Sequence, residues 1–201
     1  MSCGVGVGYH GGVPGRGGPH AAACHRRARP CPARRGRRAR PHLRALRAAL
    51  WVRAGCRVSA GVTIRELSPG ERESRFGEIL GLYGAVGWTN YTARPETLLA
   101  GYAGSLAVWG ALVGDELVGI ARVVGDGATI VFVQDLIVAP SHQRTGIGTQ
   151  LMRAVMERFS DVYQLELLTD DAPRTRAFYE SLGLARSDTM GCVAYVRVAR
   201  G

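Results

Sequence analysis

The stretch Gln143-Arg144-Thr145-Gly146-Ile147-Gly148-Thr149 decides how this chain folds. An apolar, β-branched run over residues 128–138 leads into it. A helical pattern follows, in which Ile147, Leu151, Val155 and Phe159 recur four residues apart. The first pattern is typical of a buried strand, and the second of a helix that buries one face. The stretch is therefore predicted to be a glycine-punctuated loop between a strand and the start of a helix.

Such a loop is suited to bind an anion. The first N–H groups of a helix have no partner inside the helix, and the helix dipole adds partial positive charge at that end. Gly146 and Gly148 lack a Cβ, so an anion can approach the backbone closely. Gln143 and Arg144 add side-chain donors, and Arg144 adds a full charge. A glycine-rich turn is also common between a strand and a helix that bind no ligand. The spacing of the glycines matches neither the dinucleotide-binding fingerprint nor a Walker A loop.

The stretch resembles the Gln/Arg-x-x-Gly-x-Gly/Ala motif of the GNAT N-acetyltransferases, and the preceding Asp135-Leu136-Ile137-Val138-Ala139-Pro140 is part of the resemblance. In that family the motif binds the pyrophosphate of acetyl-CoA. The resemblance implies a cofactor site made of Gln143, Arg144, Thr145, Gly146, Ile147, Gly148 and Thr149. It also implies that the strand bulges away from its parallel neighbour and that the main chain of Leu136, Ile137 and Val138 binds pantetheine.

Charge divides the 201-residue chain into two parts. The formal charge is +10, and all 26 basic residues are arginines. Residues 1–61 hold thirteen of them and no acid, whereas residues 62–201 hold thirteen arginines against sixteen acids, a charge of −3. The basic excess is therefore confined to the leader, and we expect no nucleic-acid partner for the remainder.

Residues 1–61 form a leader rich in Arg, Gly, Pro and Ala, which we expect to be disordered because it cannot bury enough apolar surface. Three interpretations stay open. The leader is a basic arm for nucleic acid or anionic lipid, an arginine-rich transit peptide, or translated sequence upstream of the true start, with Val58 or Val62 as initiator. We favour the third, because the missing lysine and the abundant Ala, Gly and Arg suggest a GC-rich genome.

Cysteine and hydropathy suggest the compartment. Four of the five cysteines lie in the leader, at irregular spacings without a Cys-x2-Cys pair, so we expect no metal site. Cys192 is the single cysteine of the remainder, which is typical of a cytoplasmic protein without disulfides. No apolar run is long enough to cross a membrane, so no membrane partner is expected.

Residues 62–201 are expected to form one α/β (α+β) domain, a mixed, mostly antiparallel sheet flanked by helices. Its order, β-α-α-β-β-β-α-β-α-β, matches the GNAT order. The predicted strands span residues 62–67, 106–113, 117–124, 128–138, 163–169 and 187–198, and the predicted helices residues 68–83, 95–102, 146–159 and 172–182.

Phe178-Tyr179-Glu180-Ser181-Leu182-Gly183-Leu184 resembles a second GNAT signature, Phe/Leu-Tyr-x-x-x-Gly-Phe. The resemblance implies that Phe178 contacts the cofactor and that Tyr179 protonates the departing thiolate. A phenol is protonated at neutral pH, since its pKa is about 10. The alternative is that Tyr179 is a tyrosine of the hydrophobic core without a catalytic role.

A base and an acceptor pocket complete the predicted site. Asp135 lies on the strand beside the expected acetyl group and is our candidate base, although a structural pair with Arg122 is at least as consistent with the sequence. Glu166 is a weaker candidate. By resemblance, the loop with Trp88 and Tyr91 lies at the acceptor site; as an alternative, these aromatic rings form a hydrophobic lid over the sheet.

The sequence thus predicts an acetyl-CoA-dependent N-acetyltransferase that acts by direct transfer to a primary amine of a small molecule or peptide. The alternative is a GNAT-fold module that binds acyl-CoA without turnover, as a sensor or partner. Dimers are common in the family, so a homodimer is one expected state. The identity of the acceptor amine is not encoded in these cofactor motifs.

Overall fold

The computed structural model describes residues 61–197, and the predictions for residues 1–60 lie outside them. Five strands form one sheet in the order β1-β2-β3-β4-β5. Neighbours along this order pair antiparallel except β4 and β5, which are parallel. This confirms the predicted mixed, mostly antiparallel sheet. The strands are β1 (Val62–Glu66), β2 (Ala107–Val113), β3 (Glu116–Gly125), β4 (Ile130–Val138) and β5 (Gln164–Leu167).

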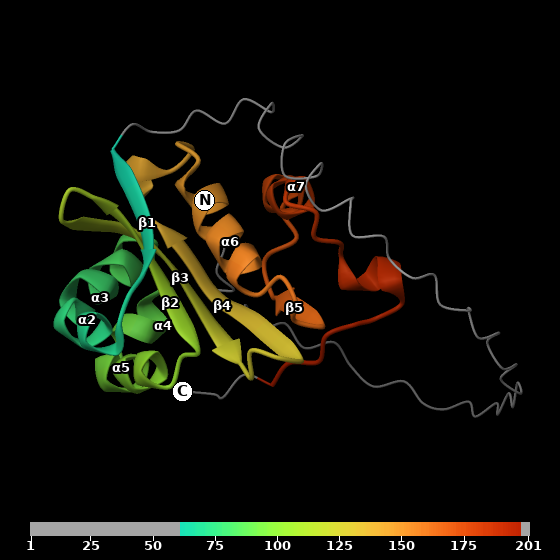
Figure 1. Ribbon diagram of the computed structural model, residues 1–201, viewed down its shortest axis with the longest axis horizontal. Helices are drawn as coiled ribbons and strands as arrows, with labels where there is room; N and C mark the ends of the chain where they lie inside the picture. The colour runs from blue at the N-terminus through green and yellow to red at the C-terminus, as the bar shows by residue number, and fades with distance from the viewer. Residues whose placement is uncertain (1–60, 198–201) are drawn as a thin grey trace, which may run out of the picture. The chain divides into compact units, whose positions relative to one another are not determined.

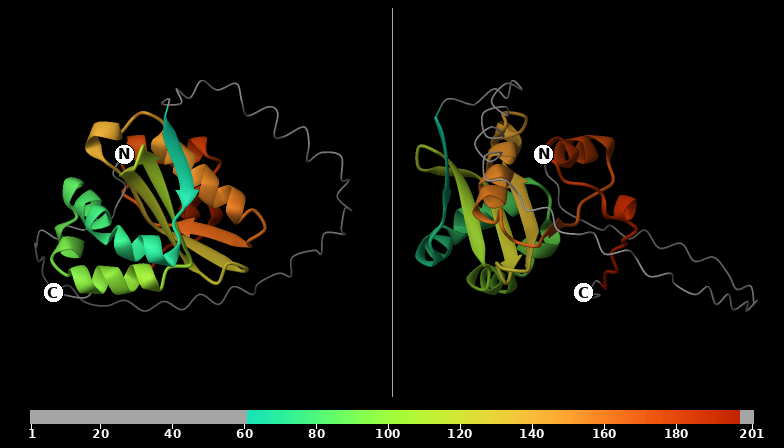
Figure 2. Two further views of the ribbon diagram at one scale, coloured as in Figure 1. Left: turned by 60° about the vertical axis from the view of Figure 1, so that its left-hand side comes forward. Right: turned by 45° about the vertical axis from the view of Figure 1, so that its right-hand side comes forward.

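Helices cover both faces of this sheet (Figures 1 and 2). One face carries α2 (Pro69–Ser74), α3 (Phe76–Ala85), α4 (Thr89–Thr92) and α5 (Pro95–Ala103), and the other carries α6 (Ile147–Arg158) and α7 (Pro173–Ser181). Each face has its own apolar cluster. Tyr83 and Ile137 belong to the α2–α5 cluster, while Leu136 and Leu151 belong to the α6 cluster.

The first predicted helix is divided in two. It begins as expected, with a capping box between Ser68 and Glu71 and Pro69 in the first turn. It then breaks at Arg75, whose φ of −97° and ψ of 12° are not helical. Arg75 instead reaches across to the β2–β3 turn, where it donates to the Asp115 carbonyl at 2.9 Å. A contact between distant segments thus decides a boundary that the local pattern does not show.

The predicted last strand, residues 187–198, is not formed over the residues that the structure describes. Ser187–Met190 makes a 3-10 turn, η4, and residues 192–197 have no regular structure. Arg186 forms ion pairs with Asp171 and Asp188, and Gly191 takes a left-handed φ of 76°. These features bend the chain out of the extended form that the alternating sequence favours by itself.

The turn between β3 and β4 is built around one carboxylate. Asp126 accepts N–H bonds from Ala128, Thr129 and Ile130 at 2.7–3.0 Å. These bonds and a bond from the Thr129 hydroxyl hold the pKa of Asp126 well below its usual range. Gly125, just before it, has φ 137° and leaves room for the Ile130 carbonyl, which an added Cβ would overlap.

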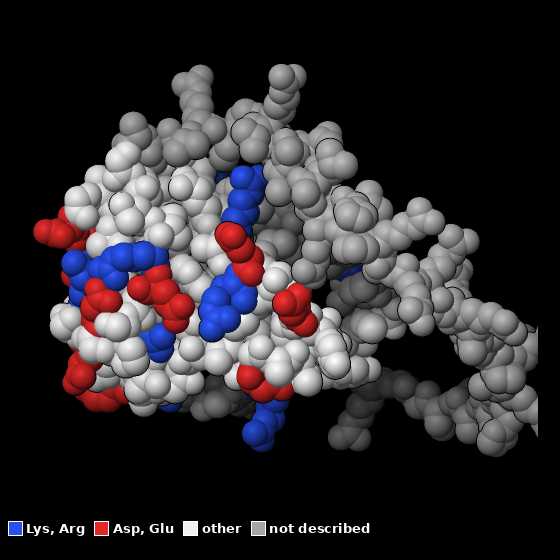
Figure 3. Space-filling view, viewed as in Figure 1, with Lys and Arg blue, Asp and Glu red and all other residues white. Residues whose placement is uncertain are grey.

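Opposite charges are interspersed on the face that carries β1, α2 and α3 (Figure 3). Arg65 pairs with Glu71 at 2.6 Å, and Arg75 pairs with Glu78 at 3.0 Å. Among the described residues of this face, arginines therefore alternate with acids. Among the described residues, no helix is long and apolar enough to cross a membrane.

Replacing Gly125 by Ala should destabilise the fold by roughly 2 kcal/mol or more, because the new methyl group combines a left-handed φ with a backbone clash. Gly114→Ala is the matched control, since Gly114 also has positive φ, at 59°, but nothing lies within 4 Å of an added Cβ. Urea unfolding followed by circular dichroism measures both. Equal losses in the two variants would show that the clash adds nothing.

Candidate active site

The first turn of α6 forms an uncapped helix end. Gly146 is the N-cap residue, with a left-handed φ of 88°, and no side chain caps it. The first amide to bond inside the helix is that of Gln150, which donates to the Gly146 carbonyl at 3.0 Å. The N–H groups of Ile147, Gly148 and Thr149 therefore have no partner within the helix. Together with the helix dipole, they give this end of α6 the donors that the predicted anion cradle requires.

The loop before α6 is held in shape by its own side chains. Gln143 donates through Nε2 to the Val138 carbonyl at 3.0 Å, and Thr145 donates to the His142 carbonyl at 2.6 Å. Arg144 is exposed and has a φ of 65°, the one positive φ of a non-glycine residue in residues 61–197. Such strain persists where a loop shape is needed for function. One donor of the Gln143 side chain is thus engaged within the loop, whereas the Arg144 side chain is exposed to solvent.

The end of β4 separates from β5. The two strands pair only from Ile130–Gln164 to Val133–Leu167, and β5 ends at Leu167. On the other side of β4, the register with β3 shifts so that Gln134 is skipped, which is a β-bulge. The bulge predicted from the resemblance is therefore present. From Asp135 to Val138, β4 pairs with β3 alone and leaves its second edge open.

Strand alternation decides which groups face this opening. The Ala139 amide donates to Val118 on β3 at 2.8 Å, so every second residue of β4 directs its main chain to β3. By the same alternation, Leu136 and Val138 face the opening, and Ile137 bonds to Ile120. This corrects the prediction that the Ile137 main chain binds the cofactor, because the N–H and C=O of Ile137 are directed to β3. Leu136 and Val138 remain available, although Gln143 occupies the Val138 carbonyl.

The two signature motifs meet in space. A Cβ added to Gly148 would lie 3.7 Å from the ring of Phe178, so α7 packs beside the start of α6. Tyr179 is buried in the α6 cluster, and its ring meets Phe178 edge-to-face at 4.9 Å. Thr175, one turn earlier, is also buried. The predicted acid thus shares an apolar cluster with Leu136 and Val138 of β4.

Asp135 lies on the opposite face of β4. It is 1% exposed and forms an ion pair with Arg122, its cross-strand partner on β3. The Arg122 guanidinium also lies 5.3 Å from the ring centre of Tyr102 and donates to the Ser105 hydroxyl at 3.4 Å. The structural pair considered for Asp135 is therefore formed. Its second oxygen, Oδ1, is buried and has no hydrogen-bond partner among the described residues.

The two aromatic residues predicted for the acceptor site have different environments. Trp88 is buried in the α2–α5 cluster, as the lid alternative supposed. Tyr91 is half-buried, and its ring centre lies 5.1 Å from that of Tyr83, with the two rings tilted by 50°. Burial, with the nearby charge of Asp135, raises the pKa of Tyr91, and a bond with the Gln134 side chain opposes this shift. Tyr91 therefore lies against the bulge at Gln134, whereas Trp88 is buried in the core next to Tyr91.

Sequence reasoning missed Gln134, Gln150 and Thr169. Gln134 forms the bulge, while Gln150 in α6 and Thr169 after β5 carry buried polar atoms that have no hydrogen-bond partner among residues 61–197. Buried polar groups are normally paired, so such atoms suggest a missing ligand or water. No local pattern marks these residues, because the bulge depends on the register between β3 and β4. Among residues 61–197, no cluster of His, Cys, Asp and Glu can hold a metal ion.

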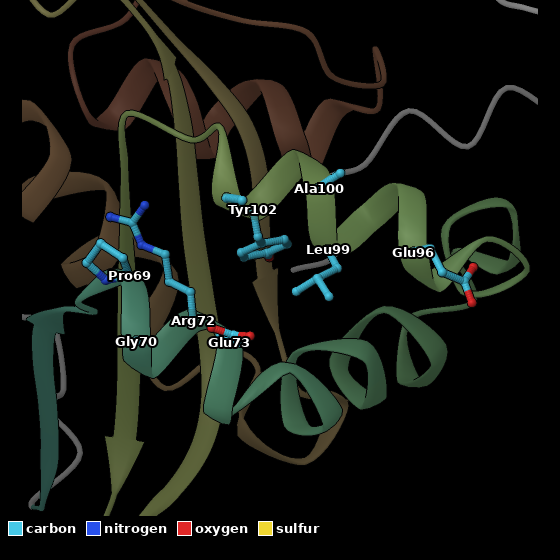
Figure 4. Close-up of a pocket in the computed structure, with 9 residues that line it drawn as sticks. Pro69, Gly70, Arg72, Glu73, Glu96, Leu99, Ala100 and Tyr102 are labelled. Atoms are coloured by element: carbon cyan, nitrogen blue, oxygen red, sulfur yellow. The ribbon is translucent and has the colours of Figure 1, made fainter.

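A separate pocket of about 520 Å³ lies between α2 and α5 (Figure 4). Arg72, Glu73, Glu96 and Leu99 line it. The Arg72 guanidinium is bound to two carbonyl oxygens, at 3.0 and 3.1 Å. None of the residues predicted to bind cofactor lines this pocket, and it lies on the face of the sheet opposite α6. We therefore place the site at the β4–β5 opening.

Known acetyltransferases resemble this chain. A family model described as an acetyltransferase (GNAT) domain matches residues 104–183, which include the opening, the cradle and α7. A solved GNAT-family acetyltransferase from Streptococcus pneumoniae is 40% identical; the match covers 70% of this chain and 99% of that one, with a TM-score of 0.61. No curated protein matches the chain.

More distant structures share the fold. An aminoglycoside acetyltransferase from an uncultured soil metagenomic sample is 22% identical, over 70% of this chain and 99% of its own, with a TM-score of 0.53. Another from such a sample, solved with sisomicin, is 18% identical, over 70% and 97%, with a TM-score of 0.56. At these identities the likeness concerns the fold alone.

Replacing Arg122 by Met should cost about 3–5 kcal/mol of stability, because it leaves the Asp135 carboxylate buried without its partner. The double variant Arg122→Met/Asp135→Leu should recover much of this loss, since it removes both charges. Urea unfolding measures the cycle, with Arg153→Met on the exposed side of α6 as control. A double variant no more stable than Arg122→Met would contradict the pairing.

Proposed function

The chain belongs to the GNAT acetyltransferase family, and we propose that it transfers the acetyl group of acetyl-CoA directly to a primary amine of a small molecule or peptide. The observation that carries the proposal is the opening between β4 and β5. It lies beside an uncapped helix end, and a buried tyrosine, Tyr179, shares an apolar cluster with Leu136 and Val138 of β4. This arrangement supports a binding site with a proton donor close to it.

The residues of the opening fit acetyl-CoA. The free amides of Ile147, Gly148 and Thr149 suit a pyrophosphate, and Arg144 adds a charge beside them. The free edge of β4 suits an extended chain of amides, which bonds to Leu136 and Val138 as an added strand does. Phe178 packs against Gly148 and bounds this surface.

Acetyl-CoA supplies an acetyl group activated as a thioester. The chain's own residues then assist the attack of the amine. We assign to the Leu136 N–H the role of donor to the carbonyl oxygen as negative charge develops there, because this group faces the opening next to the bulge. Tyr179 protonates the leaving sulfur. No residue of the chain needs to carry the acetyl group.

The acceptor amine must lose a proton before it attacks. A free alkyl amine has a pKa near 10.4, so about 1 in 10³ molecules is neutral at pH 7. We propose that Asp135 accepts this proton through Oδ1, directly or by way of water, while Arg122 holds its other oxygen. Glu166, which is exposed on β5, is the weaker candidate.

We place the acceptor beside Tyr91, where α4 meets the bulge of β4. The charge of −3 on residues 62–201 favours basic amines. Two fold relatives are named aminoglycoside acetyltransferases, so aminoglycosides belong in a first screen with polyamines, amino acids and peptides. Release of free thiol by the full chain in the presence of acetyl-CoA identifies the acceptor.

Replacing Tyr179 by Phe should lower kcat about 10²-fold, because the variant keeps the ring but loses the proton donor. The Kd for acetyl-CoA should stay within about twofold, a change below 0.5 kcal/mol. Thiol release measures the first quantity and calorimetry the second.

Tyr163→Phe is the matched control, since Tyr163 is an exposed tyrosine outside the opening. Full activity of the Tyr179→Phe variant would refute the role given to this hydroxyl. Binding of acetyl-CoA without thiol release by the unchanged protein, across the amine screen, would instead support a module that binds without turnover.

Replacing Arg144 by Ala should raise the Kd for acetyl-CoA about tenfold, because one charge-assisted contact to phosphate is lost. Arg153→Ala, on the exposed side of α6, controls for the change in net charge. Calorimetry at two salt concentrations separates a local contact from a general charge effect. Equal Kd values for the two variants would remove Arg144 from the cradle.

A further inference from the structure

The pocket between α2 and α5 lies outside the proposed acetyl-transfer site. Its volume of about 520 Å³ is in the range of about 300–1,000 Å³ that is common for pockets that bind small molecules. Residues 69–73 line it from one side and residues 96–103 from the other. None of the residues assigned to the cofactor, the acceptor or proton transfer is among them. The pocket is therefore a separate candidate for a ligand site.

Small residues leave the space between the two helices unfilled. A Cβ added to Gly70 of α2 would meet no atom within 4 Å. On α5, Ala100 and Ala103 line the pocket and are exposed. Figure 4 shows Leu99 and Tyr102 directed from α5 into the space between the helices. The pocket thus combines an apolar wall with open access.

The floor of the pocket is a buried and well-connected layer. Tyr102 is 0% exposed, and its hydroxyl lies 3.1 Å from that of Tyr83. The Arg122 guanidinium lies 5.3 Å from the ring centre of Tyr102. Arg72, which is also buried, donates to two main-chain carbonyl oxygens at 3.0 and 3.1 Å. Side chains that are already held in this way lose little freedom when a ligand binds, which favours binding.

Negative charge prevails at the pocket. Glu73 and Glu96 are exposed, and neither carboxylate forms an ion pair within residues 61–197. Arg72 is the one basic residue that lines the pocket. Its guanidinium is directed to the two carbonyl oxygens and lies 3.9 Å from the Glu66 carboxylate, so its charge is already balanced. The two glutamates are left to attract a cation.

These features suit a protonated aliphatic amine. Carboxylates such as those of Glu73 and Glu96 attract an ammonium group, although their exposure to water weakens each contact. The half-buried Leu99 offers apolar surface to a hydrocarbon chain. Phosphates and other anions are disfavoured, because the two glutamates repel them. A linear amine can use both the charge and the apolar wall.

We propose that the pocket between α2 and α5 binds a protonated aliphatic amine and is distinct from the acceptor site proposed beside Tyr91. Tyr102 lies between this pocket and Arg122, so the bound amine lies close to the side chains that hold Asp135. The amine is not acetylated in this pocket. The proposal concerns binding alone and does not depend on acetyl transfer.

Titration of the full chain with hexamethylenediamine, followed by nuclear magnetic resonance, tests this proposal. This linear diamine carries two positive charges at neutral pH, since the pKa of an alkyl amine is near 10.4. The amide signals of Glu73 and Ala100 should shift, and the Ala100 shift gives the Kd of the pocket. Hexamethylene glycol has the same chain without charge. It should bind at least tenfold more weakly, a difference of about 1.4 kcal/mol.

The double variant Glu73→Gln/Glu96→Gln should raise the Kd for the diamine about tenfold, because both carboxylates are lost. Glu157→Gln is the matched control, since Glu157 is exposed on α6, and it should leave the Kd unchanged. Ala100→Phe keeps the charges but fills the space, and it should abolish the shift at Glu73.

Four outcomes would overturn the proposal. They are an absence of shifts, equal binding of the glycol, an unchanged Kd in the double variant, and shifts confined to Tyr91 and Leu136 at the proposed acetyl-transfer site. None of these measurements requires turnover. A protein that binds the diamine here without acetyl transfer, or transfers acetyl without binding it here, is therefore recognised as such.

Discussion

The site depends on one constraint, the end of pairing between β4 and β5 after Val133 and Leu167. Up to that pair, β4 is an interior strand with both edges filled. Beyond it, the bulge at Gln134 turns the strand, and the pairing with β3 alone keeps it in place. A fixed strand with one free edge is a rigid row of donors and acceptors. Because this row ends at Val138, close to Gly148 at the start of α6, an extended ligand with phosphates at one end can use both features.

The side chains of β4 point alternately to the two faces of the sheet, and the two faces have different environments. Leu136 and Val138 pack their side chains against α6 and α7, so that face belongs to the cofactor helices. Asp135 and Ile137 point to the α2–α5 face, where Arg122, Tyr102 and Tyr83 pack. The Tyr83 and Tyr102 hydroxyls lie 3.1 Å apart there. In the proposed reaction, the amine would approach a thioester held along the edge from the face of Asp135 and Tyr91, and Tyr179 would approach its sulfur from the α6 face. Direct transfer requires such an arrangement, because both reactants must meet at one carbon.

The Arg122–Asp135 pair connects this chemistry to the fold. Both residues are buried, and they are cross-strand partners next to the bulge. Arg122 also reaches the end of α5 through Ser105 and the Gly101 carbonyl, each at 3.4 Å. The α5 end, β3 and the bulged part of β4 are thus tied by one guanidinium. A charge pair of this kind adds little net stability, yet loss of one partner is costly, so it favours a single arrangement of the bulge.

The sequence by itself determined the elements and the chemistry of the cradle. Residues 143–149 define a loop whose glycines and helix start suit phosphate, and hydrophobic periods of two and about 3.6 give most strands and helices, because these patterns are local. Only the tertiary structure decided which groups are free. It paired Asp135 with Arg122, directed the Ile137 main chain to β3 and buried Trp88. It also left the strand-like residues 192–197 outside every strand that the structure describes. Each of these outcomes depends on strand register or on contacts between distant segments. Neither the register nor such contacts can be predicted from the local sequence pattern.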